Sequence, residues 1–246
     1  MRWYGADLHI HSALSACAAD AMTPGGVADA VCAAGIHLAA ITDHNSCGNA
    51  AVFGAALEGR QVTPIYGMEL ETREEVHVLC LFGTLAAAMK WHDWVQERLP
   101  PVPNDEQVFG QQLLFDAEGQ VAAKVDNLLS LASDIGLAEA AAEVVAGDGL
   151  CIPAHVDRPA YSLFGSLGLV PPDVVFAAFE VSPRANPEGV RDRYGLDRQS
   201  LVSFSDAHRL GEIMPARTAL LLAEPSFAEF GLALRNEAGR KVVVLD

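Results

Sequence analysis

Apolar segments of this chain end repeatedly in histidine or carboxylate residues. The segment Ala6–Ile10 runs into a polar HIHS, and the next apolar segment, HLAAI, runs into TDHN. The endings of this kind contain His9 and His11, Asp43 and His44, Glu69, His155, and Asp206 with His208, while His77 lies inside a further segment. Because the carboxyl ends of parallel strands meet at one rim of an α/β barrel, we expect these side chains to converge on one site.

Segments with helical spacing alternate with these apolar segments. Thr23 and Pro24 are typical of a helix start, and Gly35 is typical of its end. Further helices are expected over Asn49–Leu57 and Leu137–Ala146. Besides the first two segments, we expect strands over Gln61–Ile65, Glu75–Phe82, Leu150–Ala154, Val174–Glu180, Leu201–Ser205 and Ala219–Leu222. This alternation predicts a mostly parallel sheet with crossover helices, either open or closed into a barrel.

Two features modify that plan. His77 lies inside its expected strand and not at the end, so this strand is expected to run differently from the others. The stretch 89–126 contains Pro100, Pro101 and Pro103, followed by a hairpin pattern around Glu118. It is too short to bury a core of its own, so we interpret it as an insertion within a single domain spanning 1–246.

The charge balance is strongly acidic. The 246 residues include 16 basic and 32 acidic side chains, for a formal net charge of −16. Binding of long nucleic acid or of an anionic membrane depends on basic residues, so we expect neither as a partner. An acidic chain does suit a protein that concentrates cations. The five cysteines include no CxxC and the first residues no apolar signal core, which favours a cytoplasmic protein without disulfides.

The histidine pattern is that of a metal site. His9 and His11 lie two apart on a strand, so their side chains point to the same face. Mixed histidine and carboxylate ligands suit zinc, manganese or iron. A carboxylate such as Glu69 can bridge two ions, and two ions roughly 3.5–4 Å apart can generate a hydroxide and clamp substrate oxygens. We expect the two remaining histidines, His37 and His92, to be structural.

Five motifs together resemble one protein family. DLHIHS, ITDHNS, GMELETREEVHVL, IPAHVDR and FSDAHR are similar to those of the PHP family, named for polymerase and histidinol phosphatase. The resemblance covers nearly the whole chain apart from the insertion. It implies a distorted (β/α)7 barrel, two or three divalent metal ions at one centre, and phosphoesterase activity.

The resemblance also implies a role for each ligand. His9, His11 and Asp206 would bind the first metal, Glu69 would bridge the first and second, His77 and His155 would complete the second, and His44 and His208 would hold the third. The chain departs from the family at one ligand of the third metal. Many members have a histidine six residues after His11, where this chain has Cys17. Asp20 lies in the same loop, so either residue could complete that site.

Four further residues are candidates for chemistry at this site. Asp43 precedes a ligand histidine and could orient an imidazole, so it joins Glu69 as a candidate catalytic residue. Arg158 and Arg209 follow ligand histidines closely, and guanidinium groups bind phosphate oxygens in a bidentate manner. Asn45 could donate a hydrogen bond to a phosphate oxygen.

These features predict hydrolysis of a small phosphate ester, such as a nucleotide or a sugar phosphate. A 5′–3′ exonuclease acting on short oligonucleotides is an alternative. So is an amide hydrolase that uses the same metals against a carbonyl group. A non-catalytic domain with a relic site would be expected to lack several ligands, whereas this chain departs from the family pattern only at Cys17.

Overall fold

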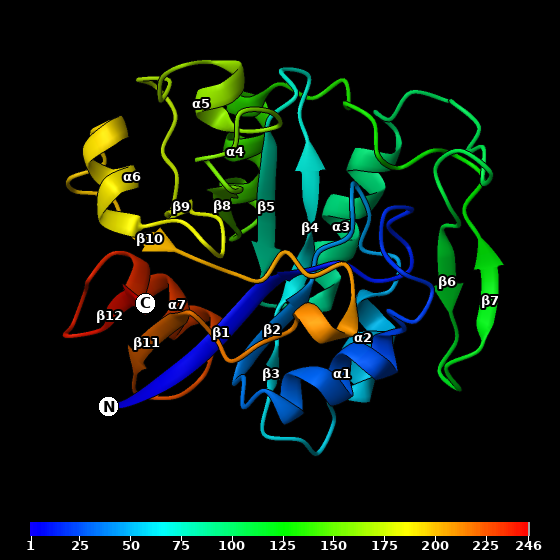
Figure 1. Ribbon diagram of the computed structural model, residues 1–246, viewed down its shortest axis with the longest axis horizontal. Coiled ribbons are helices and arrows are strands. Elements are labelled where there is room, and N and C mark those ends of the chain that lie inside the picture. Colours follow the sequence, from blue (N-terminus) through cyan, green and yellow to red (C-terminus); the bar gives the residue numbers. More distant parts are fainter. Residues whose placement is uncertain (246) are drawn as a thin grey trace.

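The computed structural model describes residues 1–245 and has a mixed α/β architecture (Figure 1). In chain order its elements are β1 (Arg2–Ile10), α1 (Pro24–Ala33), β2 (Leu38–Ile41), α2 (Ala50–Ala56), β3 (Thr63–Pro64), β4 (Tyr66–Glu71), β5 (His77–Phe82), α3 (Leu85–Gln96), β6 (Leu113–Phe115), β7 (Val121–Lys124), α4 (Leu137–Ala146), β8 (Leu150–Pro153), α5 (Leu163–Ser166), β9 (Phe179–Glu180), α6 (Pro187–Tyr194), β10 (Leu201–Val202), a 3₁₀ turn η1 (Leu210–Glu212), β11 (Thr218–Leu222), α7 (Phe227–Leu234) and β12 (Lys241–Val244).

The strands form separate sheets. One has the order β12-β11-β1-β2-β3, another the order β4-β5-β8, and β9 pairs with β10. One isolated bridge, between His44 and Glu69, connects the first two sheets. Within residues 1–245 no continuous ladder closes these sheets into a barrel, so the structure shows a mixed α/β fold without establishing the expected (β/α)7 barrel.

The expected predominance of parallel pairing was wrong. β1 and β2, β2 and β3, and β9 and β10 are parallel. In contrast, β1 pairs with β11, β11 with β12, β4 with β5, and β5 with β8 in antiparallel fashion. The cause is visible in the connections, because β4 is joined to β5 by a short turn and not by a crossover helix.

The reversed direction of β5 explains the position of His77. Glu71, at the end of β4, lies opposite His77, at the start of β5. The N-terminal end of β5 therefore meets the edge at which β1, β2 and β4 end. The expectation that this strand runs differently from its neighbours is confirmed.

Local signals explain the helix boundaries. The Thr23 hydroxyl accepts a hydrogen bond from the Gly26 backbone at 3.0 Å, Pro24 opens α1, and Gly35 follows the helix with a left-handed φ of 70°. The side chains of Val27 and Val31 face the core. Such capping satisfies backbone groups that the first and last turns leave without partners.

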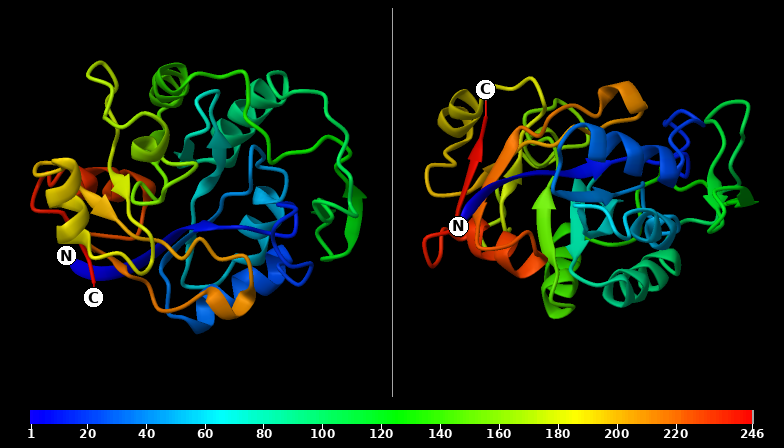
Figure 2. Two further views of the ribbon diagram at one scale, coloured as in Figure 1. Left: turned by 45° about the horizontal axis from the view of Figure 1, so that its top comes forward. Right: turned by 90° about the horizontal axis from the view of Figure 1, so that it is seen from below.

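The stretch expected to be an insertion has two parts. Its first residues belong to α3, which packs on β4 and β5 and buries Trp91 and Val95. The hairpin β6–β7 turns at Asp116–Gln120, as its sequence predicts, and lies at one side of the molecule (Figures 1 and 2). The Leu113 backbone nitrogen bonds to the Ala13 carbonyl at 2.8 Å, so the hairpin supports the loop after β1.

Candidate metal centre

The Glu69 carboxylate lies at the centre of a buried histidine cluster. Its oxygens lie 3.0 Å from His77 Nδ1, 3.1 Å from His155 Nε2, 3.2 Å from His9 Nε2, 3.2 Å from His44 Nδ1 and 3.4 Å from His11 Nε2. Burial favours the protonated acid, but the neighbouring His77 and His9 outweigh it and hold the pKa of Glu69 well below its usual value. Glu69 is therefore an anion shared among five imidazoles.

Strand β1 supplies two of these imidazoles. Because His9 and His11 alternate with Ile10 along the strand, both rings point to the same side, and both are fully buried. Asp206, in the loop after β10, lies 3.1 Å from His11 Nε2 and 3.4 Å from His9 Nε2. These three residues form one group of donors close enough to share a metal ion.

Two further donor groups adjoin the first. One consists of His44, Glu69 and His77, and the other of His11, His44 and His208. The ring centroids of His11 and His208 are 4.2 Å apart, and those of His11 and His44 are 4.6 Å apart. Donors from the ends of β1, β2 and β4, the start of β5, and the loops after β8 and β10 thus share one pocket.

The chemistry of the cluster fits divalent metal ions. Among the described residues, His9 Nε2 and His44 Nδ1 lie near Glu69 without the geometry of a hydrogen bond, and His155 Nδ1 is buried without a hydrogen-bond partner. Buried polar atoms normally have partners, so these orphan atoms indicate a missing ligand. Burial, and the proximity of His44 and His208, lower the pKa of His11 to about 3, which leaves a neutral ring able to donate a lone pair. Nitrogen and oxygen donors of this kind suit zinc, manganese or iron.

The two candidates for the remaining ligand of the third metal, Cys17 and Asp20, have different surroundings. The Cys17 thiol contacts both His208 and His44, and although burial opposes this, those contacts lower its pKa to about 6. Asp20 instead accepts a hydrogen bond from Gln111 at 3.1 Å and belongs to none of the donor groups. Cys17 also lies outside the donor groups, but of the two residues it is the one that contacts histidines of the third group.

Sequence reasoning missed Glu180, at the end of β9. Its carboxylate lies 2.9 Å from His9 Nδ1 and also accepts the His155 backbone N–H at 3.1 Å. A carboxylate on the far nitrogen fixes the tautomer and direction of a ligand ring, here with Nε2 facing Glu69. The signal was present, because Glu180 ends an expected strand as the other site residues do.

Asp43, expected to orient an imidazole, reaches one only through an intervening hydroxyl. It accepts hydrogen bonds from the Ser12 backbone at 2.7 Å, the Ser12 hydroxyl at 2.6 Å and the Ser15 hydroxyl at 2.8 Å. Ser15 Oγ in turn lies 3.0 Å from His11 Nδ1. Asp43 thus acts on His11 through Ser15, and its full burial removes it from substrate.

Asn45 does not face the cluster as a donor to substrate. Its amide nitrogen donates to the Leu129 and Leu131 carbonyls at 2.6 and 2.8 Å, and its oxygen accepts the Glu71 backbone N–H at 2.8 Å. Its polar atoms are therefore occupied in joining the end of β4 to the loop before α4. This correction follows from burial, which sequence position alone does not reveal.

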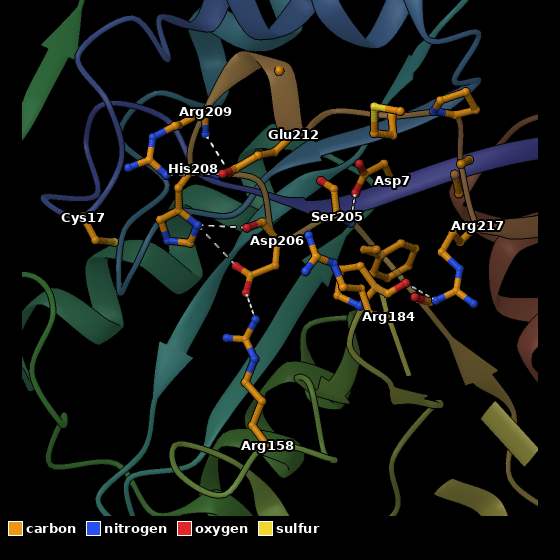
Figure 3. Close-up of a pocket in the computed structure, with 18 residues that line it drawn as sticks. Asp7, Cys17, Arg158, Arg184, Ser205, Asp206, His208, Arg209, Glu212 and Arg217 are labelled. Atoms are coloured by element: carbon orange, nitrogen blue, oxygen red, sulfur yellow. Dashed lines mark hydrogen bonds and ion pairs between the residues drawn. The ribbon is translucent and has the colours of Figure 1, made fainter. Parts of the chain in front are cut away.

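The two arginines expected to bind substrate differ in placement. Arg158 donates to Asp206 at 2.5 Å and remains partly exposed, whereas Arg209 pairs with Glu212 at 3.3 Å and is largely exposed. Both line a cavity of about 720 Å³ that also includes Cys17 and His208 (Figure 3). The remaining histidines, His37 and His92, accept backbone N–H groups of Gly5 and Cys47 and lie in none of the donor groups.

Comparisons with known proteins agree with this picture. The family model of the PHP domain matches residues 7–152. A relative, the uncharacterized protein YqxK of Bacillus subtilis (strain 168), is 27% identical over 200 residues, which are 77% of this chain and 46% of that protein. The chain thus spans about half the length of this curated relative.

Solved structures share the fold. The lesion-specific endonuclease PfuEndoQ from Pyrococcus furiosus superposes with a TM-score of 0.70 and 21% identity over 98% of this chain and 58% of its own. A proposed metal-dependent phosphoesterase from Bifidobacterium adolescentis superposes with a TM-score of 0.54 and 17% identity over 87% of this chain and 90% of its own.

One finding overturns the expectation that long nucleic acid is not a partner. Endonuclease Q, which superposes with a TM-score of 0.67 and 20% identity over 98% of this chain and 58% of its own, has been solved with a 27-mer duplex that carries an abasic lesion at the active site. The expectation failed because net charge sums the whole surface. Four arginines, Arg158, Arg184, Arg209 and Arg217, line the cavity that also includes Asp206 and His208.

Two other expectations touch on location. No described helix has the length and apolar character needed to cross a membrane. All five cysteines are free thiols, and three of them are buried.

Proposed function

We propose, because this chain belongs to the PHP domain family, that it is a metal-dependent hydrolase of phosphate ester bonds. The observation that carries the proposal is the convergence of five imidazoles on the Glu69 carboxylate, with the Arg158 guanidinium paired to Asp206 of an adjoining donor group. Histidine and carboxylate ligands would hold the ions, and a cation next to them would attract an anionic substrate.

The donor groups suggest which residues would hold the metals. His9, His11 and Asp206 would take one ion, His44, Glu69 and His77 a second, and His11 or His44 with His208 and Cys17 a third, with His155 available to the second. Bound divalent ions would supply Lewis-acid activation of water and of the phosphoryl oxygens. A thiolate at Cys17 would favour zinc at that position.

The protein's own residues would hold this arrangement in place. Glu180 fixes the His9 ring through Nδ1, and Asp43 fixes the Ser15 hydroxyl that contacts His11. Only one guanidinium nitrogen of Arg158 is engaged with Asp206, and its side chain is 43% exposed. Arg158 can therefore bind a phosphate oxygen and stabilise charge that grows in the transition state.

The test compares phosphate esters with N-acyl substrates and then removes Arg158. We expect the metal-loaded protein to hydrolyse phosphate esters, and Arg158→Ala to lower kcat/KM roughly 10²-fold, as loss of one oxyanion donor does. Arg158→Lys should recover only part, because a point charge cannot replace the planar fork. Metal content should stay unchanged.

Arg60→Ala is the matched control, since Arg60 is a partly exposed arginine that pairs with Asp29 and does not line the cavity. It should leave kcat/KM unchanged. Hydrolysis of N-acyl substrates alone would refute the proposed reaction class. Unchanged phosphatase kinetics in Arg158→Ala would remove Arg158 from substrate binding.

A further inference from the structure

The cavity beside the metal centre extends well beyond it. Its lining includes Cys17, Asp206 and His208 at the metals, but also Arg184 and Arg217 (Figure 3). A volume of about 720 Å³ lies in the range of pockets that hold whole drug-sized ligands, roughly 300–1,000 Å³. A single phosphate group at the metals would leave much of it unfilled.

Arg184 differs from the other arginines of this cavity. Arg158 pairs with Asp206, Arg209 pairs with Glu212, and Arg217 donates to the Pro183 and Leu245 carbonyls. Arg184 is exposed on the cavity side, and within residues 1–245 it has neither an ion pair nor a side-chain hydrogen bond, so its guanidinium is free to bind a ligand. Figure 3 shows its side chain extending into the space that Arg158 and Asp206 also face.

Ser203 gives independent evidence for a ligand in the same cavity. It lines the cavity and is fully buried, and its hydroxyl is among the buried polar atoms without a hydrogen-bond partner. Its backbone is held by Thr218, whose hydroxyl bonds both the Ser203 nitrogen and the Ser203 oxygen at 2.8 Å. A buried hydroxyl left without a partner is unfavourable, so a ligand acceptor there would satisfy it.

The acidic groups of this cavity are already engaged. Asp7 accepts the Ser205 backbone N–H at 3.1 Å, Asp206 pairs with Arg158, and Glu212 accepts the backbone N–H groups of His208 and Arg209. The unpaired cation and the unpaired hydroxyl therefore lie in a lining whose carboxylates do not neutralise them. This combination fits an anion that also accepts hydrogen bonds.

We infer that Arg184 and Ser203 form a second phosphate subsite, apart from the metal centre, and that the substrate is a nucleotide strand with several phosphates. The inference rests on the proposed phosphoesterase function. A strand whose scissile phosphate lies at the metals would place a neighbouring phosphate in the same cavity, against Arg184. A compound with only one phosphate would leave this subsite empty.

The experiment neutralises one phosphate of the strand and one side chain of the protein. Tetrathymidylates that each carry a single uncharged methylphosphonate linkage are compared with unmodified tetrathymidylate, using metal-loaded wild type and Arg184→Ala. In the wild type, one non-scissile position should lower kcat/KM by about 10- to 100-fold when neutral, the usual strength of a charge-assisted hydrogen bond. In Arg184→Ala, kcat/KM for the unmodified strand should fall by a similar factor, and the methylphosphonate at that position should lower kcat/KM little further.

Such non-additivity is the signature of direct contact between the two groups. Arg184→Lys should restore part of the effect. Arg235→Ala, which removes an exposed arginine that pairs with Glu237 outside the cavity, should leave the wild-type pattern intact. If the two changes lower kcat/KM additively, or if no methylphosphonate position lowers kcat/KM of the wild type, the second subsite is overturned.

A one-phosphate substrate separates this inference from the proposed function. The p-nitrophenyl ester of thymidine 5′-monophosphate contains one phosphodiester and no neighbouring phosphate. If Arg184→Ala lowers kcat/KM for this ester as much as for tetrathymidylate, the subsite is refuted and the phosphoesterase stands. If it hydrolyses neither of these nor any other phosphate ester, the proposed function fails.

Discussion

At the scale of single residues, the direction of the His9 ring depends on Glu180, a carboxylate outside the donor groups. The ring could turn either nitrogen towards Glu69. Because Glu180 contacts Nδ1, Nε2 is the nitrogen that faces Glu69. Burial favours the neutral ring, but Glu180 and Glu69 outweigh it and raise the pKa of His9 well above its usual value. The contact thus sets both the orientation and the basicity of a ligand.

Replacing this carboxylate should weaken metal binding without removing a ligand. We expect Glu180→Gln to lower metal affinity or activity roughly 10- to 100-fold, the usual effect of losing an outer partner of a ligand histidine. Competition with a chromophoric chelator measures the affinity. Glu188→Gln, an exposed carboxylate on α6, is the control. Equal affinities for wild type and Glu180→Gln would show that the His9 ring is held by other contacts.

The remaining ligand of the third metal can be tested with a pair of substitutions in one loop. Cys17 contacts His44 and His208, whereas Asp20 bonds to Gln111. We expect Cys17→Ala to lower the metal content measured by elemental analysis and Asp20→Asn to leave it unchanged. The opposite pattern would assign the third position to Asp20.

At the scale of elements, the sequence predicted which strands end at the site better than how they pair. The expected helix Leu137–Ala146 and the hairpin after Leu113 match α4 and β6–β7. The expected strand Val174–Glu180 is reduced to Phe179–Glu180, because little beyond the Ala177 backbone bond pairs its first half. Local patterns encode helices, caps and turns, whereas pairing direction depends on contacts distant in sequence.

Close pairing of β4 with β5 makes a specific demand on Gly67. A Cβ at Gly67 would lie 2.2 Å from the Cys80 carbonyl oxygen, while a Cβ at Gly25 in α1 would meet nothing within 4 Å. We expect Gly67→Ala to lower the free energy of unfolding by at least the roughly 1–3 kcal/mol of an overpacked core. Gly25→Ala should raise it by about 0.4–1 kcal/mol. Urea denaturation measures both, and a Gly67→Ala variant as stable as wild type would contradict the close approach.

At the scale of the whole molecule, composition predicted cation binding but not the charge of the substrate site. A net charge of −16 carries no information on where the 16 basic residues lie. The fold gathers Arg158, Arg184, Arg209 and Arg217 from separate loops into one lining. Their convergence depends on tertiary structure, so only Arg158 and Arg209, which follow the expected ligand histidines, could be recognised in the sequence.

The metals should also stabilise the whole chain, and this effect has a definite pH dependence. Burial alone would lower the pKa values of His9 and His44. For His9 the contact with Glu180 outweighs burial, and for His44 the contacts with Cys17 and Glu69 do so. Both pKa values are therefore raised well above 6.5. In metal-free protein the stability from these raised values is present at low pH and is lost as pH rises through them. Metal binding requires neutral rings, so it strengthens over the same range. Through both effects, the stability of the metal-loaded form increases relative to that of the metal-free form as pH rises.

Chelation should therefore lower Tm more at about pH 8.5 than at about pH 7. Both pH values lie above the histidine pKa of the unfolded chain. His11, whose pKa is lowered, stays neutral throughout this range and so changes the stability little. One site filled at about 1,000 times its Kd contributes about 4 kcal/mol, or roughly 8–16 °C for a domain of this size. Thermal unfolding with and without chelator measures the difference. Glu69→Gln should reduce it, because a neutral amide replaces the shared anion, whereas His92→Gln, outside the donor groups, should preserve it. A Tm unaffected by chelator at both pH values would mean that the buried histidines are not held together by metal.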